Sequence, residues 1–243
     1  MPRHSHDFQP VDYGAFELER TAPIVPQLYK MIRRKILSLE YRPGTEISEA
    51  GLAAASGVSR TPARQVIKDL IGERLLEAFP SQGTFVSRID GERLREALNV
   101  RSILEPLIAK ERALDENRTS LIMGLREALA KQRTALENGD SAMAYHCDSQ
   151  FHEAICSRKP DSFLWQVIRQ ARTEGDRLHA LSTNKADNLM CALEHHEAIL
   201  LAIQAGDGEA TEARMQEHMA QNQSMFLKIR EEDIDCFVEG TVL

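Results

Sequence analysis

Cysteine, aromatic residues and long apolar runs are all scarce in this chain of 243 residues. Its four cysteines form no CxxC pair and show no disulfide-framework spacing, which argues against a secreted disulfide scaffold. No stretch is apolar for long enough to cross a bilayer, and no signal peptide is visible. We therefore expect a cytoplasmic protein without a membrane partner. An aromatic content of only 5% fits a core built from leucine, isoleucine and alanine.

Charge is unevenly distributed along the chain. The formal net charge is −7, yet residues 23–90 hold 10 Lys and Arg against 7 Asp and Glu. Residues 91–243 hold 18 basic residues against 26 acidic ones. A packaging protein that binds DNA over its whole surface would be more basic, so that class is excluded. A weakly basic module joined to an acidic one is typical of specific nucleic-acid binding.

The segment 57–70 has the pattern of a turn followed by a helix. Gly57 supplies a positive-φ turn, Ser59 is a good N-cap, and Pro62 is tolerated because it falls in the first helical turn. One side of this helix is apolar and the other is basic; the basic residues are Arg60, Arg64 and Lys68. Such a helix fits the DNA major groove, although the basic row alone also fits a solvated helix face.

The neighbouring segments decide between these two interpretations. A first amphipathic helix is predicted over residues 25–39, and Ser48 is placed to cap a second one. After the basic helix, residues 75–79 and 84–86 read as the two strands of a hairpin, with a glycine at the turn. Three helices and a hairpin make a winged helix-turn-helix.

These residues resemble the N-terminal domain of GntR-type bacterial transcription regulators. The resemblance rests on Arg42-Pro43-Gly44, the segment 57–62, Arg64, Leu75-Leu76 and the segment 83–86. It implies that Arg60, Thr61 and Arg64 touch DNA, and that the wing around Gln82 and Gly83 enters the minor groove. It also implies a dimer on a short palindromic operator. Many members have an arginine where this chain has Ala50, so the operator sequence stays open.

From Asp90 onward, the apolar residues recur at helical spacing. Glycine and proline cluster at breaks near residues 138–140, 159–161 and 205–208. We predict a mostly α protein in which about six helices form an antiparallel bundle. The apolar residues expected in the core from the first of these helices include Leu94, Leu98, Ile103, Leu104 and Leu107. The expected domains are a flexible tail 1–22, a DNA-binding domain 23–90, an effector-binding and dimerisation domain 91–232, and a C-terminal tail 233–243.

Four side chains of the bundle have the spacing of a metal site. Asp148 and His152 stand four residues apart, on one helical face. His196 and His218 are equally far from Asp207, so they lie side by side if their helices form an antiparallel hairpin. Three imidazoles and a carboxylate suit a divalent transition metal, with open positions if it is five- or six-coordinate. Taken singly, each histidine is equally compatible with an ordinary core or surface position.

The same segment resembles the ligand-binding domain of the FadR subfamily. Asp148-x-x-Phe151-His152, the segment 196–200, Gly206-Asp207 and Met215-x-x-His218 carry this likeness over residues 92–230. Many members bind a metal through the Asp and three His, so the resemblance implies that Asp148, His152, His196 and His218 are ligands. His195 is the alternative to His196, which we favour because its separation from His218 matches the family. Zinc, manganese, nickel and iron all remain open.

An arginine of the first bundle helix is the candidate for binding an effector. Arg101 and Glu105 stand four residues apart, which fits an ordinary helical ion pair. Alternatively, Arg101 points into a cavity and binds a carboxylate through two N–H groups of its guanidinium. We expect a small organic acid, such as a sugar acid or a dicarboxylate, as effector. Arg172 and Arg177 are weaker candidates for the same role, and we expect a solvated charge for both. Asn222 is a further candidate for the pocket.

Two classes of function fit these features. The favoured one is a homodimeric repressor whose helical domain senses a metabolite and alters DNA binding. The rival is a metal-dependent enzyme that acts on a small organic acid, because open coordination sites support catalysis. No general base stands beside the proposed ligands, and a helical enzyme would leave the winged helix unexplained. A pure interaction scaffold does not account for the placement of the histidines.

Overall fold

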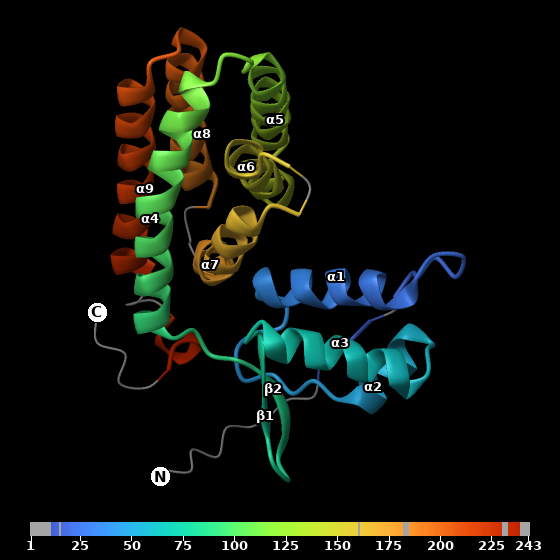
Figure 1. Cartoon of the computed structure of the whole chain (residues 1–243). Coiled ribbons are helices and arrows are strands. Elements are labelled where there is room, and N and C mark those ends of the chain that lie inside the picture. The colour runs from blue at the N-terminus through green and yellow to red at the C-terminus, as the bar shows by residue number, and fades with distance from the viewer. Residues whose placement is uncertain (1–10, 15, 160, 182–184, 230–232, 239–243) are drawn as a thin grey trace. The chain divides into compact units, whose positions relative to one another are not determined.

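The computed structural model describes residues 11–14, 16–159, 161–181, 185–229 and 233–238 (Figure 1). Most of these residues are helical, which confirms the predicted fold class. They fall into two compact units. The first contains the chain up to Gly91 together with the segment 233–238, and the second contains the described residues from 92 to 229.

The first unit is built on three helices, α1 (Ile24–Leu37), α2 (Glu49–Ser56) and α3 (Arg60–Gly72). The predicted signals are present: Ser48 accepts a hydrogen bond from the Gly51 N–H, and Gly57 ends α2 with φ of 61°. Ser59 precedes α3 as expected, but its hydroxyl makes no capping bond. Apolar residues of all three helices share one core, which includes Leu28, Ile32, Ile36, Leu52, Ala63, Val66 and Leu70.

A two-stranded wing follows the helices. Strands β1 (Leu76–Phe79) and β2 (Gly83–Val86) pair antiparallel, with Phe79 opposite Gly83. Gly83 has φ of 133°, and a Cβ there would lie 3.2 Å from Glu46 Oε1, so the position requires glycine. Ile47 N–H donates to the Thr84 carbonyl at 2.8 Å, which adds a third extended segment to the sheet.

Two segments that we expected to be tails pack against this unit where the structure describes them. The Tyr13 hydroxyl accepts a hydrogen bond from the Ser48 N–H at 2.8 Å. Near the other end of the chain, the 3-10 helix η1 (Ile234–Cys236) leads into a parallel bridge between Ile89 and Phe237. Phe237 is 4% exposed. The described residues 11–14, 16–22 and 233–238 therefore belong to the packed structure around the winged helix.

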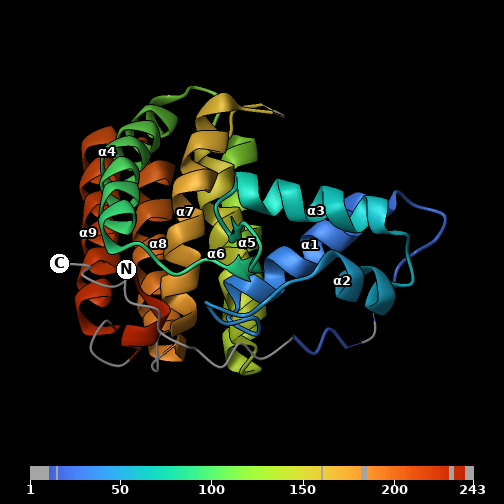
Figure 2. The ribbon, with the colours of Figure 1, turned by 90° about the horizontal axis from the view of Figure 1, so that it is seen from below.

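The second unit is the predicted helical bundle. Its helices are α4 (Gly91–Leu114), α5 (Thr119–Glu137), α6 (Ser141–Cys156), α7 (Phe163–Leu181), α8 (Lys185–Ala205) and α9 (Gly208–Ile229). Figures 1 and 2 both show α4, α8 and α9 grouped together, with α5 and α6 on the other side of the bundle. Leucine, isoleucine and alanine dominate the core, as expected from the composition. None of the helices described is long and apolar enough to span a membrane.

Helix α4 has two apolar faces, where a single one was expected. Leu94 and Leu98 are buried, but Ile103 is 67% and Leu107 is 49% exposed, so their assignment to the core was wrong. Val100 and Leu114 are exposed as well. We call Val100, Ile103, Leu107 and Leu114 the α4 stripe. Their separations of three, four and seven residues place them on one narrow side of the helix, with the spacing of a coiled-coil seam.

Candidate functional site

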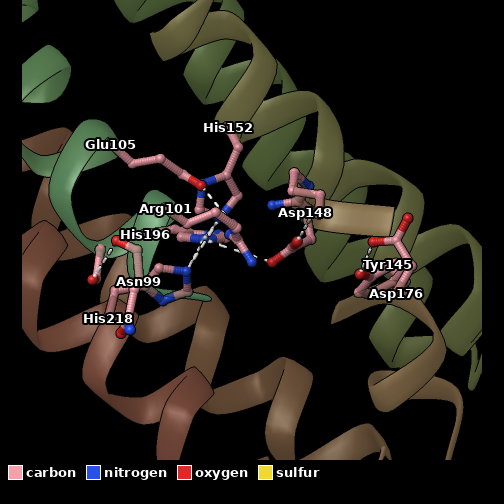
Figure 3. Close-up of polar contacts among 11 residues, drawn as sticks. Asn99, Arg101, Glu105, Tyr145, Asp148, His152, Asp176, His196 and His218 are labelled. Carbon is pink, nitrogen blue, oxygen red and sulfur yellow. Dashed lines mark hydrogen bonds and ion pairs between the residues drawn. The ribbon is translucent and has the colours of Figure 1, made fainter. Parts of the chain in front are cut away.

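The bundle brings together the four side chains that the sequence singled out (Figure 3). Helix α6 supplies Asp148 and His152, α8 supplies His196, and α9 supplies His218. All four are buried, and one ligand atom from each lies within 4.8 Å of the others. The three imidazole Nε2 atoms face one another at 3.2–3.3 Å. Asp148 Oδ1 lies 3.7 Å from His196 Nε2.

Neighbouring acceptors orient two of the three imidazoles. The Nδ1 of His152 contacts Glu105 Oε2, and the Nδ1 of His196 lies 3.4 Å from Gln132 Oε1. The Phe151 ring stacks on the His196 ring at 4.1 Å. When Nδ1 carries the proton and donates it to an oxygen, Nε2 keeps its lone pair. With their protons on Nδ1, His152 and His196 direct unprotonated nitrogens at the centre of the cluster.

The electrostatics of the cluster favour neutral His196 and His218 beside ionised carboxylates. Burial lowers the pKa of His196 to about 3 and lowers the pKa of His218 well below its usual range. Burial opposes ionisation of Asp148, but the guanidinium of Arg172, 2.8 Å away, holds its pKa well below the usual range. Burial likewise opposes ionisation of Glu105, while the guanidinium of Arg101 keeps its pKa low. Neutral imidazole and carboxylate are the forms that bind metals.

A divalent transition metal fits these residues. Nitrogens bound about 2.0–2.1 Å from one ion lie roughly 2.8–3.4 Å apart at octahedral or tetrahedral angles, and the observed Nε2 separations fall within this range. A proton on Nε2 of His218 can satisfy only one of the other two nitrogens at a time, whereas a cation at the centre can accept a lone pair from all three.

The structure distinguishes between the two adjacent histidines of α8. His196 is fully buried and contacts both His152 and His218. His195 is partly exposed, and its ring packs edge-on against His218, with centroids 5.9 Å apart. It is not part of the four-residue cluster. The geometry therefore matches the choice of His196 over His195.

A cavity of about 50 Å³ adjoins the cluster. Asp148 and His218 form part of its lining, and so do Arg101, Arg172 and Tyr145. Arg101 is 5% exposed, its Nε donates to Glu105 Oε1 at 2.6 Å, and its Nη2 has no partner among the described residues. Arg101 therefore forms the helical ion pair and also lines the cavity, and its binding of a carboxylate stays a prediction. An orphaned guanidinium nitrogen beside a cavity suits an anionic ligand.

Two arginines were assigned to solvent wrongly. Arg172 is 3% and Arg177 is 1% exposed, because the second half of α7 packs into the bundle. Sequence reasoning also missed Glu105 as a partner of His152, and Gln132, Tyr145 and His179 altogether. The Tyr145 ring stacks on His179 at 4.4 Å, and its hydroxyl donates to Asp176. The side chain of Asn222 lies outside the described residues.

The residues expected to contact DNA lie on the surface of the first unit. Arg60, Thr61 and Arg64 are exposed at the N-terminal end of α3, and Gln82 is exposed before Gly83 in the wing. Arg64 is paired: its Nε lies 3.0 and 3.1 Å from the two carboxylate oxygens of Glu49 on α2. That ion pair raises the pKa of Arg64 and lowers the pKa of Glu49.

Comparison with known families decides what kind of protein this is. Residues 25–86 match the bacterial regulatory proteins of the gntR family, and residues 96–221, more than half of the chain, match the FCD domain. The chain belongs to the GntR family of bacterial transcription regulators. Its second unit is an FCD domain, and the site described above lies within it.

Individual GntR relatives resemble the chain over most of its length. The HTH-type transcriptional repressor RspR of Escherichia coli is 28% identical over 92% of this chain and 97% of its own length. An uncharacterized regulator from an unstable DNA locus of Streptomyces ambofaciens is 30% identical over 79% of this chain and 80% of its own length. The structure of E. coli McbR/YncC has the same fold, with a TM-score of 0.72 at 23% identity over 85% of this chain and 98% of that one.

The rival interpretation as an enzyme is set aside by these comparisons. The GntR family and the similar proteins are transcription regulators. The buried cluster therefore lies in the FCD domain of a transcription regulator.

Proposed function

We propose that this GntR protein is a homodimeric, metal-containing repressor of the FadR subfamily that acts in the cytoplasm and responds to a small organic acid. The observation that carries the proposal is the buried cluster of Asp148, His152, His196 and His218 beside a cavity lined by Arg101. A repressor role is supported by the relative named a repressor, which matches over 92% of this chain.

In the proposed regulator, the N-terminal end of α3 reads the operator. Arg60, Thr61 and Arg64 are exposed there, and guanidinium groups bind guanine edges or phosphates. Glu49 holds the Nε of Arg64, which leaves the terminal nitrogens of that guanidinium for DNA. Gln82 and Gly83 contact the minor groove from the wing. Selection of bound sequences from a random DNA pool tests this part: enrichment of a short palindrome supports it, and recovery of unrelated sequences contradicts it.

The proposed metal is a divalent transition ion held by Asp148, His152, His196 and His218. Zinc, manganese, nickel and iron all accept this mixture of nitrogen and oxygen ligands. When bound, the ion supplies a positive centre that a carboxylate can coordinate. The residues of the chain supply the rest: Glu105 and Gln132 accept from Nδ1 of two ligands, and Arg172 neutralises Asp148.

The proposed effector is a small carboxylate in the cavity beside the cluster. A volume of about 50 Å³ holds on the order of four water molecules, at roughly 10–15 Å³ of such volume each. This space suits a small anion, and a larger effector requires movement of the helices around it. The guanidinium group of Arg101 can donate hydrogen bonds to one carboxylate of the effector, and the metal can coordinate another oxygen of it.

The signal has a short covalent route to the DNA-binding unit. Arg101 lies on α4, which begins at Gly91, five residues after β2 ends at Val86. A ligand that prefers one position of α4 therefore acts on the segment that joins the two units. It alters DNA binding only to the extent that it prefers one arrangement of the two DNA-binding heads.

The second copy in the proposed dimer packs against the α4 stripe. Ile103 and Leu107 are 67% and 49% exposed, and burial of such side chains contributes about 1.5–3 kcal/mol each when complete. Their coiled-coil spacing offers a seam to an identical helix across a two-fold axis. A dimer on this seam places the effector-binding helices of both copies next to each other.

A further inference from the structure

One buried carboxylate of α4 contacts both parts of the proposed sensing site. Glu105 is completely buried. Its Oε1 accepts from Arg101 Nε at 2.6 Å, and its Oε2 contacts the Nδ1 of His152. Figure 3 shows Glu105 reaching from α4 toward His152 of α6, with Arg101 beside it. No other described carboxylate makes hydrogen bonds to both an arginine of the cavity and the outer nitrogen of a cluster histidine.

We infer that Glu105 is a positioning residue that orients the proposed metal ligand His152 and the cavity residue Arg101 with the two oxygens of one carboxylate. The inference rests on the proposed metal site, and it assigns to Glu105 the coupling between that site and the effector cavity. Glu105 itself lies on the far side of the His152 ring from Nε2, so it is not a ligand in this arrangement.

The effect on His152 follows from the two nitrogens of its ring. A carboxylate at Nδ1 favours the tautomer that carries the proton there, because the N–H then donates to an anion. Nε2 keeps its lone pair and lies 3.3 Å from His196 Nε2 and 3.2 Å from His218 Nε2. The opposite tautomer would put a proton into the centre of the cluster, where it would block a cation. Loss of such an outer partner typically weakens metal binding about 10–100-fold.

The effect on Arg101 follows from the shape of the guanidinium group. Glu105 occupies Nε, which fixes the plane of the group, while the buried Nη2 has no partner among the residues described. Arg172, the other arginine of the cavity, is instead held by Asp148 through Nη2 at 2.8 Å. Arg101 is therefore the arginine with an open terminal nitrogen, and Glu105 determines where that nitrogen points.

Because both contacts use one carboxylate, the two binding events are linked. An anion that draws the Arg101 guanidinium toward itself weakens the hydrogen bond from Arg101 Nε to Glu105 Oε1. The negative charge of Glu105 then interacts mainly with the Nδ1 proton of His152. A carboxylate that accepts a stronger hydrogen bond from Nδ1–H makes the imidazole a stronger metal ligand. Binding of the anion should therefore strengthen binding of the metal, and thermodynamic linkage requires the reverse effect to be equal.

The first test reads the tautomer of His152 in metal-free protein by the nitrogen chemical shifts of its ring. The wild type should show a proton on Nδ1, and Glu105→Ala should shift the ring toward a mixture of the two tautomers. A wild-type His152 with its proton on Nε2 would overturn the inference. This measurement needs no metal, so it is independent of whether the proposed metal site is correct.

The second test measures zinc affinity by competition with a chromophoric chelator. Glu105→Ala should weaken zinc binding about 10–100-fold, and Glu105→Gln, which restores an acceptor for Nδ1, should recover most of that loss. The matched control is Glu174→Ala, which removes another buried carboxylate paired with an arginine, Arg93, at 2.7 Å. Wild-type affinity in Glu105→Ala, an equal loss in Glu174→Ala, or no recovery in Glu105→Gln would each overturn the inference. Absence of zinc binding in the wild type would instead refute the metal site.

Discussion

The Nε2 atoms of His196 and His218 lie 3.2 Å apart across the hairpin that α8 and α9 form. Residues at equal distances from the turn of an antiparallel hairpin lie side by side, and Asp207 stands midway between these two histidines. Both rings are buried, and His152 of α6 completes a triangle of nitrogens with them. Three helices thus meet at one cluster.

A matched pair of adjacent histidines tests the metal site. His196→Ala removes a nitrogen from the centre of the cluster, whereas His195→Ala removes a ring that only packs against it. Element analysis of protein purified without chelators should find metal in the wild type and in His195→Ala, and far less in His196→Ala. Equal metal content in the two variants would contradict the assignment of His196. A wild-type protein without metal would count against the site itself.

The stability of metal-free protein should fall as the pH drops below about 6.5. Burial lowers the pKa of His196 to about 3 and also lowers the pKa of His218, so only the unfolded chain takes up their protons in this range. The stabilisation is complete above pH 6.5 and declines toward pH 3, at up to about 1.4 kcal/mol per pH unit for each imidazole. Urea unfolding of chelator-treated wild type and His196→Asn at several pH values measures it. His196→Asn should show the smaller slope, and identical slopes would refute the prediction.

Replacing both Arg60 and Arg64 by alanine should abolish tight operator binding without unfolding the protein. Both side chains are exposed, and each bidentate contact to a base is worth about 1–3 kcal/mol of discrimination. The control is the double variant Arg133→Ala, Arg214→Ala, which removes the same charge from exposed ion pairs of the second unit. Gel-shift titrations at fixed salt should show loss in the first variant alone. Wild-type affinity after loss of Arg60 and Arg64 would refute the assignment of α3.

The α4 stripe should be essential for the dimer. Ile103→Glu with Leu107→Glu places two charges on the proposed seam, where their burial against a second copy is unfavourable. Met123→Glu with Leu201→Glu is the control, because these side chains are 67% and 66% exposed and lie on other helices. Light scattering after gel filtration should give the mass of two chains for the wild type and the control, and of one chain for the stripe variant. A monomeric wild type, or a stripe variant that still dimerises, would exclude this interface.

Local sequence signals predicted the elements and the pairing of His196 with His218 because the causes of these features are local. Gly57 ends α2 with the positive φ expected of it, and Ser48 caps that helix. The symmetry of His196 and His218 about Asp207 depends only on two helices folding back on each other. These features follow from helical geometry along the chain, and no knowledge of the rest of the fold is needed.

Features that depend on which side of a helix packs inward could not be predicted in this way. Arg101 and Glu105 have the same spacing in an exposed ion pair and in a buried one. Ile103 and Leu107 looked like core residues because α4 is apolar on two sides, and only the packing of the bundle separates them. Arg172 is buried because its charge is balanced by Asp148, which lies on another helix.

The central claim is that the metal and Arg101 together hold a small carboxylate, and titration calorimetry tests it most directly. A panel of organic acids is titrated into metal-loaded wild type, metal-stripped wild type and metal-loaded Arg101→Ala protein. We expect that an acid binds the metal-loaded wild type and binds the other two samples at least tenfold more weakly, a loss of about 1.4 kcal/mol. Equal binding of that acid to all three samples would show that neither the ion nor Arg101 holds the ligand, and would contradict the account.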